Sequence, residues 1–359
     1  METSSEARPP DAEPPLDPVG LAAAAPPPDR AAEPEGFVVE VGPGERIHFL
    51  DWGGPASGGS GDEGVPVAPG VLLAHGLGGT AWAWTAVARR LRRVARTVAA
   101  DLRGHGLSDA PTSGYDPDSL AADLVAVAEG AGLVAIPGFE PEAGSGASRR
   151  VVLAGHGYGA IVAAWAALAL GDRCAGLVLV DGGWQDLARE SGLRPDEWLR
   201  DLAEPPEVLG SMAAYLADRR EWDPASWDAD EERAARATVV EVPAGKVVPA
   251  VRPHAMERSV EAIFAYRPAD VLPALEVPIV AVIAADDEDG TKSAALAAVD
   301  AACRAAGRSP IAVVRFPADG HNLPRYRPAE LAGVILRLVD ARPAFRPTPG
   351  TIAARDRPR

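Results

Sequence analysis

The sequence predicts a doubly wound α/β fold: a mostly parallel sheet of about eight strands with helices on both faces and a helical cap. Short apolar runs rich in β-branched residues alternate with longer alanine-rich segments of helical pattern. Most of these runs are continuous instead of alternating, which is typical of strands buried on both faces of a parallel sheet. One stretch of about 85 residues between two such runs is too long for a loop and shows helical patterns only, so it is expected to form the cap.

The first two strands are predicted at 37–41 and 47–52, where apolar residues alternate in period two around the turn at 42–44. This pattern indicates an antiparallel hairpin. Six continuous apolar runs follow it, at 71–74, 97–100, 151–154, 177–180, 279–283 and 312–315. Helical patterns between them predict crossover helices at 84–94, 119–129, 160–170 and 292–306.

These elements divide the chain into a core and its additions. The core consists of two parts, 36–183 and 271–341, which the cap at 184–270 separates. Residues 1–35 are rich in proline, alanine and acidic side chains and contain almost no large hydrophobic residue, so we expect a disordered tail there. Residues 342–359 lose the helical pattern and contain several prolines, which predicts a second flexible tail.

Composition excludes several classes of partner. The formal net charge of −16 argues against binding to nucleic acid or to an anionic membrane, because both need a basic surface. The two cysteines have no metal-ligand spacing, and no stretch is long and apolar enough to cross a membrane. We therefore expect a cytoplasmic protein that binds a small molecule and holds no metal or cofactor, and the sequence leaves any protein partner unknown.

Polar and glycine-rich segments follow five of the predicted parallel strands. Ligands bind at the carboxyl ends of the strands in an open parallel sheet, so these segments are expected to form the functional site. They are HGLGG at 75–79, DLRGHGLSD at 101–109, GHGYG at 155–159, AADD at 284–287 and FPADGHN at 316–322.

The order of these motifs resembles that of the α/β-hydrolase superfamily over roughly residues 37–340. In that family a G-x-S-x-G turn places the nucleophilic serine on a strained elbow between a strand and a helix. The matching residues here are 155–159, and Gly157 stands where the family has serine. The resemblance thus implies the family fold with no side chain at the nucleophile position.

The resemblance also implies roles for the remaining parts of the site. His321 matches the general base, and Asp287 matches the carboxylate that orients it, with Asp286 and Asp181 as alternatives for this role. The backbone N–H groups of Leu77 and Tyr158 are implied to form an oxyanion hole.

We further predict that Gly76, His156 and Trp184 contact the substrate. His75 and His105 are expected to have structural roles in their loops. The aromatic residues of the cap predict either a pocket lining or the core of the cap itself; they are Trp184, Trp198, Trp222, Trp227, Phe264 and Tyr266.

Three interpretations of function remain open. In the first, the His–Asp pair and the oxyanion hole act on a small apolar carbonyl-type substrate without forming an acyl-enzyme. In the second, the protein is catalytically inactive and serves as a ligand-binding protein or a scaffold. In the third, Gly155-x-Gly157-x-x-Ala160 forms part of a nicotinamide dinucleotide site, with Asp181 at the end of the next strand.

Overall fold

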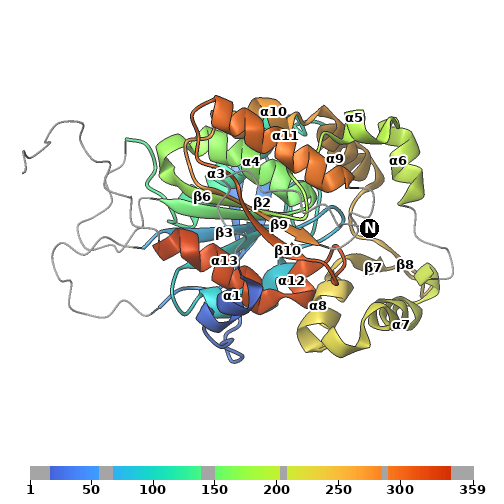
Figure 1. Ribbon diagram of the computed structural model, residues 1–359. Coiled ribbons are helices and arrows are strands. Elements are labelled where there is room, and N and C mark those ends of the chain that lie inside the picture. Colours follow the sequence, from blue (N-terminus) through green and yellow to red (C-terminus); the bar gives the residue numbers. More distant parts are fainter. Residues whose placement is uncertain (1–16, 56–67, 139–149, 203–207, 285–289, 341–359) are drawn as a thin grey trace, which may run out of the picture.

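The computed structural model describes residues 17–55, 68–138, 150–202, 208–284 and 290–340, and an eight-stranded sheet forms its centre (Figure 1). The strands lie in the order β1-β2-β4-β3-β5-β6-β9-β10, with β1–β2 and β2–β4 antiparallel and the remaining pairs parallel. Their bounds are Glu35–Gly42 (β1), Glu45–Asp51 (β2), Gly70–Ala74 (β3), Thr97–Ala100 (β4), Val151–His156 (β5), Cys174–Val180 (β6), Ile279–Ala284 (β9) and Ala312–Phe316 (β10). The predicted fold class is confirmed.

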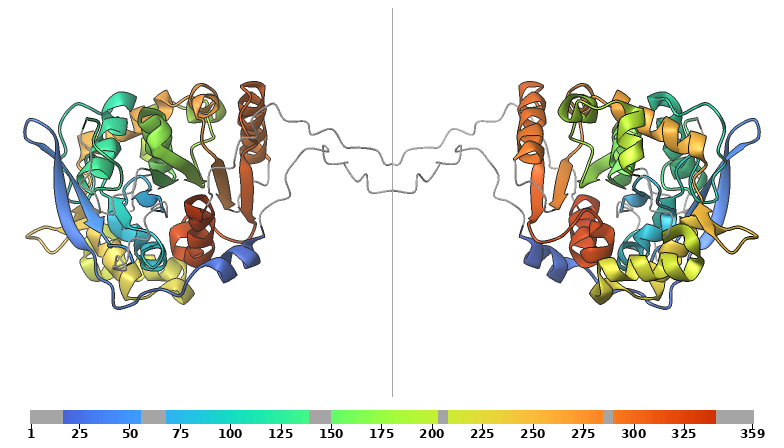
Figure 2. Two further views of the ribbon diagram at one scale, coloured as in Figure 1. Left: turned by 90° about the vertical axis from the view of Figure 1, so that its left-hand side faces the viewer. Right: turned by 90° about the vertical axis from the view of Figure 1, so that its right-hand side faces the viewer.

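Helices cover both faces of the sheet (Figures 1 and 2). Successive residues of β3 show why: Leu72 packs into the cluster formed with α3, α4 and α11, whereas Val71 and Leu73 pack into the cluster formed with α2 and α13. Both sides of a strand are therefore buried, as its continuous apolar sequence requires. These helices span Thr85–Leu91 (α2), Pro117–Gly130 (α3), Tyr158–Leu170 (α4), Thr291–Ala305 (α11) and Pro328–Asp340 (α13).

A short helix near the N-terminus corrects the prediction of a tail over residues 1–35. Helix α1 (Pro18–Ala24) is capped by Asp17, whose side chain accepts from two backbone N–H groups, and its Leu21 is buried against α13. Gly333 makes this contact possible, since a Cβ at that position would lie only 2.1 Å from the Leu21 carbonyl oxygen. A single buried leucine thus docks a segment whose composition predicted disorder; residues 1–16 lie outside the described part.

Between β6 and β9 the chain forms six helices and one hairpin within the described residues. The helices are α5 (Leu187–Ser191), α6 (Pro195–Asp201), α7 (Met212–Trp222), α8 (Ala229–Ala237), α9 (Pro253–Ala265) and α10 (Pro268–Val271). The hairpin pairs β7 (Val239–Glu241) with β8 (Val247–Pro249) and was not predicted. Single 3₁₀ turns lie at Ala81–Trp84 (η1), Gly171–Arg173 (η2), Val208–Gly210 (η3), Pro224–Ser226 (η4) and Leu272–Ala274 (η5), and α12 spans Leu323–Tyr326.

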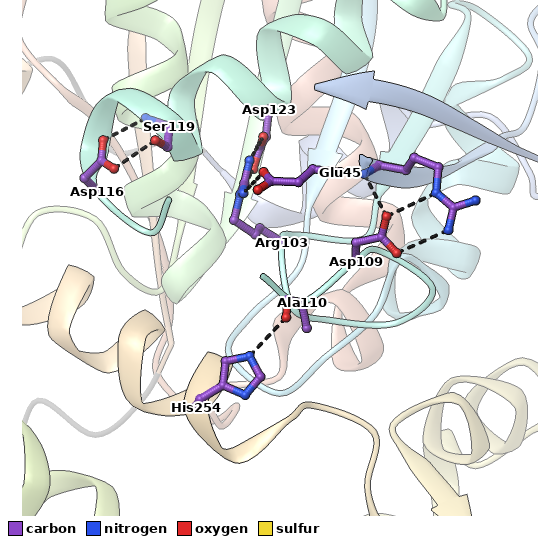
Figure 3. Close-up of polar contacts among 9 residues, drawn as sticks. Glu45, Arg103, Asp109, Ala110, Asp116, Ser119, Asp123 and His254 are labelled. Carbon is purple, nitrogen blue, oxygen red and sulfur yellow. Dashed lines mark hydrogen bonds and ion pairs between the residues drawn. The ribbon is translucent and has the colours of Figure 1, made fainter. Parts of the chain in front are cut away.

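Polar contacts attach this cap to the core at separate points. Arg89 of α2 is buried and forms ion pairs with Asp230 of α8 at 2.6 Å and with Glu33 of the N-terminal segment at 2.8 Å. Figure 3 shows His254 of α9 beside the Ala110 carbonyl, to which its Nε2 donates a hydrogen bond at 3.0 Å. The cap is therefore attached to the core both through α8, at Arg89, and through α9, at the Ala110 carbonyl. None of the helices in the described ranges is long and apolar enough to cross a membrane.

Candidate active site

A glycine-rich turn joins β5 to α4 at the centre of the sheet. Gly157 has φ 54° and ψ −113°, a backbone conformation that side chains rarely adopt, and its N–H donates to the Val180 carbonyl at 2.9 Å. Its neighbours need to be glycine because of crowding: a Cβ at 155 would lie 2.1 Å from the Gly159 carbonyl oxygen, and one at 159 would lie 2.4 Å from the Ala74 carbonyl oxygen. The turn is therefore a tight, strained passage from strand to helix.

The direction of a side chain at position 157 is fixed by this backbone. A Cβ built on Gly157 would lie 3.2 Å from His321 Nε2 and 4.0 Å from the Gly76 Cα. A group carried at this position would consequently point at the imidazole and at the HGLGG loop.

His321, in the loop between β10 and α12, forms a hydrogen-bonded pair with Asp181. The His321 Nδ1–H donates to Asp181 Oδ2 at 2.6 Å, and Asp181 Oδ1 accepts from the Ala284 N–H at 3.1 Å. Asp181 follows β6, and its φ of 44° makes it the one non-glycine residue of the described chain with a positive φ. Such backbone strain is common at functional sites, where the surrounding structure maintains it.

The carboxylate of Asp181 stays charged although its side chain is only 1 % exposed. Burial raises its pKa, but the hydrogen bond and charge of His321, the charge of Lys292 and the Ala284 N–H outweigh burial, so the pKa lies below its usual value. Lys292 Nζ lies 3.4 and 3.5 Å from the two carboxylate oxygens. An anionic Asp181 keeps the proton on His321 Nδ1, which leaves the Nε2 lone pair facing Gly157.

Among the described residues the partner of His321 is Asp181, one of the two alternatives to Asp287. Asp287 and Asp286 lie outside the described residues, and Asp181, the third alternative, occupies the position beside the imidazole. Its place at the carboxyl end of a core strand, followed by two glycines, was the sequence signal for it. Sequence reasoning missed Lys292, although it is one of only two lysines in a chain with 35 basic residues.

His156 lies directly against His321. Its Nε2–H donates to the His321 backbone carbonyl at 2.9 Å, and the two rings are tilted by 38° with centroids 4.4 Å apart. Burial, assisted by the nearby His321, lowers the pKa of His156 to about 3, so the ring is neutral near pH 7. His156 therefore positions the loop that carries His321 without competing for its proton.

Leu77 lies in the HGLGG loop and Tyr158 directly follows Gly157; these are the two residues whose N–H groups are predicted to form an oxyanion hole. Both residues line the same cavity as Gly157 and His321. Within the described residues, neither of their N–H groups donates to a backbone carbonyl of a neighbouring turn or loop. Tyr158 is also the first residue of α4, so the helix dipole adds partial positive charge at this point.

The two predicted structural histidines shape the loops beneath the site. His75 Nδ1–H donates to the Gly76 carbonyl at 2.8 Å, and its Nε2 accepts from the Leu102 N–H at 3.0 Å. His105 Nδ1–H donates to the Arg103 carbonyl, and burial lowers its pKa to about 3. The buried Arg103 pairs in turn with Asp123 and Glu45 (Figure 3). These contacts fix the DLRGHGLSD loop and involve no reacting group.

A cavity of about 1320 Å³ lies between the core and the cap and opens onto these groups. Its wall is mostly apolar, with Ile161, Trp198, Leu199, Trp222, Trp227, Val251 and Met256 among its residues. Gly76 and His156 line it as predicted for substrate contacts.

Trp184, which was also predicted to contact the substrate, does not line the cavity, because its side chain is fully buried in the core. Phe264 and Tyr266 are likewise packing residues of the core. The described residues contain no group of histidine, cysteine and acidic side chains that could hold a metal ion.

Comparison with known proteins identifies the family and agrees with the fold. The model of the alpha/beta hydrolase family matches residues 71–334. No curated protein matches the sequence. Similar solved structures include E-2-(acetamidomethylene)succinate hydrolase (19% identity, TM-score 0.62, 86% of this chain and 100% of that one). Others are an M. tuberculosis esterase (22%, 0.59, 90% and 99%) and a thioesterase domain from the curacin biosynthetic pathway (22%, 0.58, 85% and 99%).

These structures share the fold, and the family model covers the strands from Val71 onward, the turn at Gly157 and the loop of His321. The chain therefore belongs to the alpha/beta hydrolase family.

Proposed function

We propose that this protein hydrolyses a small apolar carbonyl-type substrate by direct attack of water, without an acyl-enzyme intermediate. In this proposal Gly157 occupies the nucleophile position of the family, and the His321–Asp181 pair acts as the general base. One observation carries the proposal: the pair is intact at 2.6 Å, and its free nitrogen faces a position 157 that has no side chain. A base of this kind can take a proton from water that fills the space of the absent hydroxyl.

The chemical steps follow from the arrangement. A water molecule attacks the carbonyl carbon while His321 Nε2 accepts one of its protons, and Asp181 stabilises the imidazolium. The carbonyl electrons move onto oxygen, where the N–H groups of Leu77 and Tyr158 stabilise the negative charge. The tetrahedral intermediate then expels the leaving group, which takes the proton from His321. One water is consumed, and one acid and one alcohol, thiol or amine are released.

A substrate panel with two variants tests this proposal. Turnover is measured against esters, lactones, epoxides and haloalkanes, first with the unmodified protein and then with His321→Ala and Asp181→Asn. We expect hydrolysis of at least one carbonyl substrate, no initial burst, and a loss of about 10²- to 10⁴-fold in kcat for the His321 variant. Unchanged turnover in His321→Ala would sink the proposal.

A second candidate function is ligand binding without catalysis. The observation that favours it is the combination of a large, mostly apolar cavity with a position 157 that carries no nucleophile. It predicts no turnover of the whole panel together with a thermal shift by an apolar ligand. A scaffold role would give neither result. The nicotinamide interpretation is disfavoured, because Asp181, which would bind the ribose, is engaged by His321, Lys292 and Ala284.

A further inference from the structure

The hydrogen bonds of two adjacent histidines determine which of their nitrogens carries a proton. His156 Nε2 lies 2.9 Å from the His321 carbonyl oxygen, which can only accept, so Nε2 carries the proton and Nδ1 is an acceptor. His321 Nδ1 lies 2.6 Å from a carboxylate oxygen, so Nδ1 carries the proton and Nε2 is an acceptor. The two adjacent imidazoles thus each have one ring nitrogen with a lone pair that is not used in the contacts above.

Glycine at positions 76 and 157 keeps side chains away from these two nitrogens. A Cβ on Gly76 would lie 2.9 Å from His156 Nδ1, and a Cβ on Gly157 would lie 3.2 Å from His321 Nε2. The Gly76 Cα is itself only 4.0 Å from that second Cβ position, so positions 76 and 157 lie next to each other beside the two rings. All four residues line the cavity. With any other residue at 76 or 157, a side chain would cover one of the nitrogens.

We propose that His156 Nδ1 and His321 Nε2 together bind the attacking water molecule, each accepting a hydrogen bond from one of its two O–H groups. This inference rests on the proposed function and deepens it: His156 becomes a second catalytic residue that touches the reacting water. The lone pairs of the water oxygen then point away from both rings, toward a carbonyl carbon in the cavity. In the chemical step, the O–H directed at His321 breaks and its proton moves to Nε2. The O–H directed at His156 stays intact as a hydrogen bond.

The different surroundings of the two rings explain this division of work. His321 has Asp181 behind it to stabilise a positive charge, whereas His156 has only a backbone carbonyl. The side chain of His321 is 60 % exposed, and His156 is buried. Burial in this position disfavours a charged ring, so His156 holds and orients the water while His321 takes the proton.

The pair of acceptors also predicts a preference among nucleophiles. Water can donate to both nitrogens at once, whereas an alcohol has a single O–H and can donate to only one. The site therefore favours hydrolysis over alcoholysis. Since the proposed reaction has no acyl-enzyme intermediate, the choice between water and alcohol is made when the nucleophile attacks the substrate. Removing the acceptor on His156 should remove part of this discrimination.

Two substitutions separate the acceptor on His156 from its contact with His321. His156→Gln keeps a donor for the His321 carbonyl and loses the acceptor at Nδ1. His156→Asn retains an oxygen acceptor near Nδ1 and loses the reach to that carbonyl. We expect kcat to fall about tenfold in the glutamine variant, with KM little changed and with a larger methanolysis-to-hydrolysis ratio. The asparagine variant should retain the ratio of the unmodified protein. A glutamine variant with the unaltered ratio, or an asparagine variant with the larger change in ratio, would show that His156 serves only to position His321.

A crystal structure of the unmodified protein at about 1.2 Å resolution tests the same inference without any substrate. The expected result is one water within about 2.7–3.2 Å of both His156 Nδ1 and His321 Nε2. A water bound to His321 alone, or none between the rings, overturns the inference even if the enzyme is active. A bridging water in a protein that turns over no substrate would keep the site and refute the proposed function instead.

Discussion

Replacement of Gly157 by serine gives the sharpest test of the geometry at the β5–α4 turn. The new Cβ would lie 3.2 Å from His321 Nε2, and the hydroxyl one bond further on would come within hydrogen-bond distance of that nitrogen. The contact is tighter than usual, but the His321 side chain is 60 % exposed and can shift by the few tenths of an ångström needed. We therefore expect serine to complete a Ser–His–Asp triad with His321 and Asp181.

The substitution carries a cost in stability that can be estimated. A non-glycine residue held at φ 54°, ψ −113° costs about 1–3 kcal/mol. For a domain of this size, such a loss corresponds to a decrease in Tm of about 1.5–5 °C. Gly157→Ala carries the same strain without the hydroxyl and is the matched control for it. The alanine and serine variants should have similar Tm values, both below that of the unmodified protein.

The assay is the release of p-nitrophenol from p-nitrophenyl esters after rapid mixing. The serine variant should give a burst of about one equivalent per enzyme as the acyl-enzyme accumulates, and the alanine variant and the unmodified protein should give none. Adding His321→Ala to the serine variant should abolish the burst. A folded serine variant with no burst would refute the reasoning, because the hydroxyl, the base and the oxyanion hole would then not be aligned as the structure places them.

Three further predictions concern other parts of the molecule. Asp181→Asn in the Gly157→Ser background should slow the burst about 10²- to 10⁴-fold, because an amide does not hold the required tautomer; a burst of unaltered rate would mean that another carboxylate serves His321. The pKa values of His105 and His156 are lowered to about 3 from 6.5, so their stabilisation is complete above pH 6.5 and is lost as the pH falls toward 3. At pH 5 the loss in the free energy of unfolding is about 2 kcal/mol for each ring. Urea unfolding at pH 8 and pH 5 measures it: His105→Gln should lose about 2 kcal/mol less than the unmodified protein between the two pH values. An equal loss in both proteins would contradict this prediction. Gly333→Ala should displace α1, because the Cβ would lie 2.1 Å from a backbone oxygen; faster hydrogen exchange across residues 18–24 is the expected result, and undiminished protection there would contradict the docking.

The strands and the crossover helices were predictable because burial on both faces leaves a strong signal. Each of the eight predicted apolar runs overlaps an observed strand, with only residue 52 of the run 47–52 outside it, and 160–170 lies within α4. The β7–β8 hairpin gave no such signal, since each of its strands has three residues and only the first residue of each is buried. Helix α1 was missed for a different reason: a single buried leucine and a glycine on a distant helix hold it, and composition cannot reveal a pairing of that kind.

The candidate site was predictable as a set of strand ends, but not as a set of contacts. The strand-end rule brought His321, Gly157 and the HGLGG loop together correctly. The rule could not choose which of three aspartates bonds to His321, because each of them follows a predicted strand. In the structure, Asp181 follows β6, which pairs with β9, and its carboxylate lies against the imidazole. For Trp184 the rule failed, because closeness in sequence to a site residue does not determine on which side of the backbone a large side chain is buried.

The strained turn at Gly157 has a consequence for how this sequence can change over generations. A serine there is tolerated by a fold only at the expense of stability, and selection maintains it only while its chemistry is needed. Glycine relieves that strain at once, so any lineage that acquired another route to the reaction, or another use for the cavity, would be driven toward glycine by folding alone. The glycines at 155 and 159 are held by crowding, so the turn itself would persist, and a hydroxyl beside His321 is one substitution away.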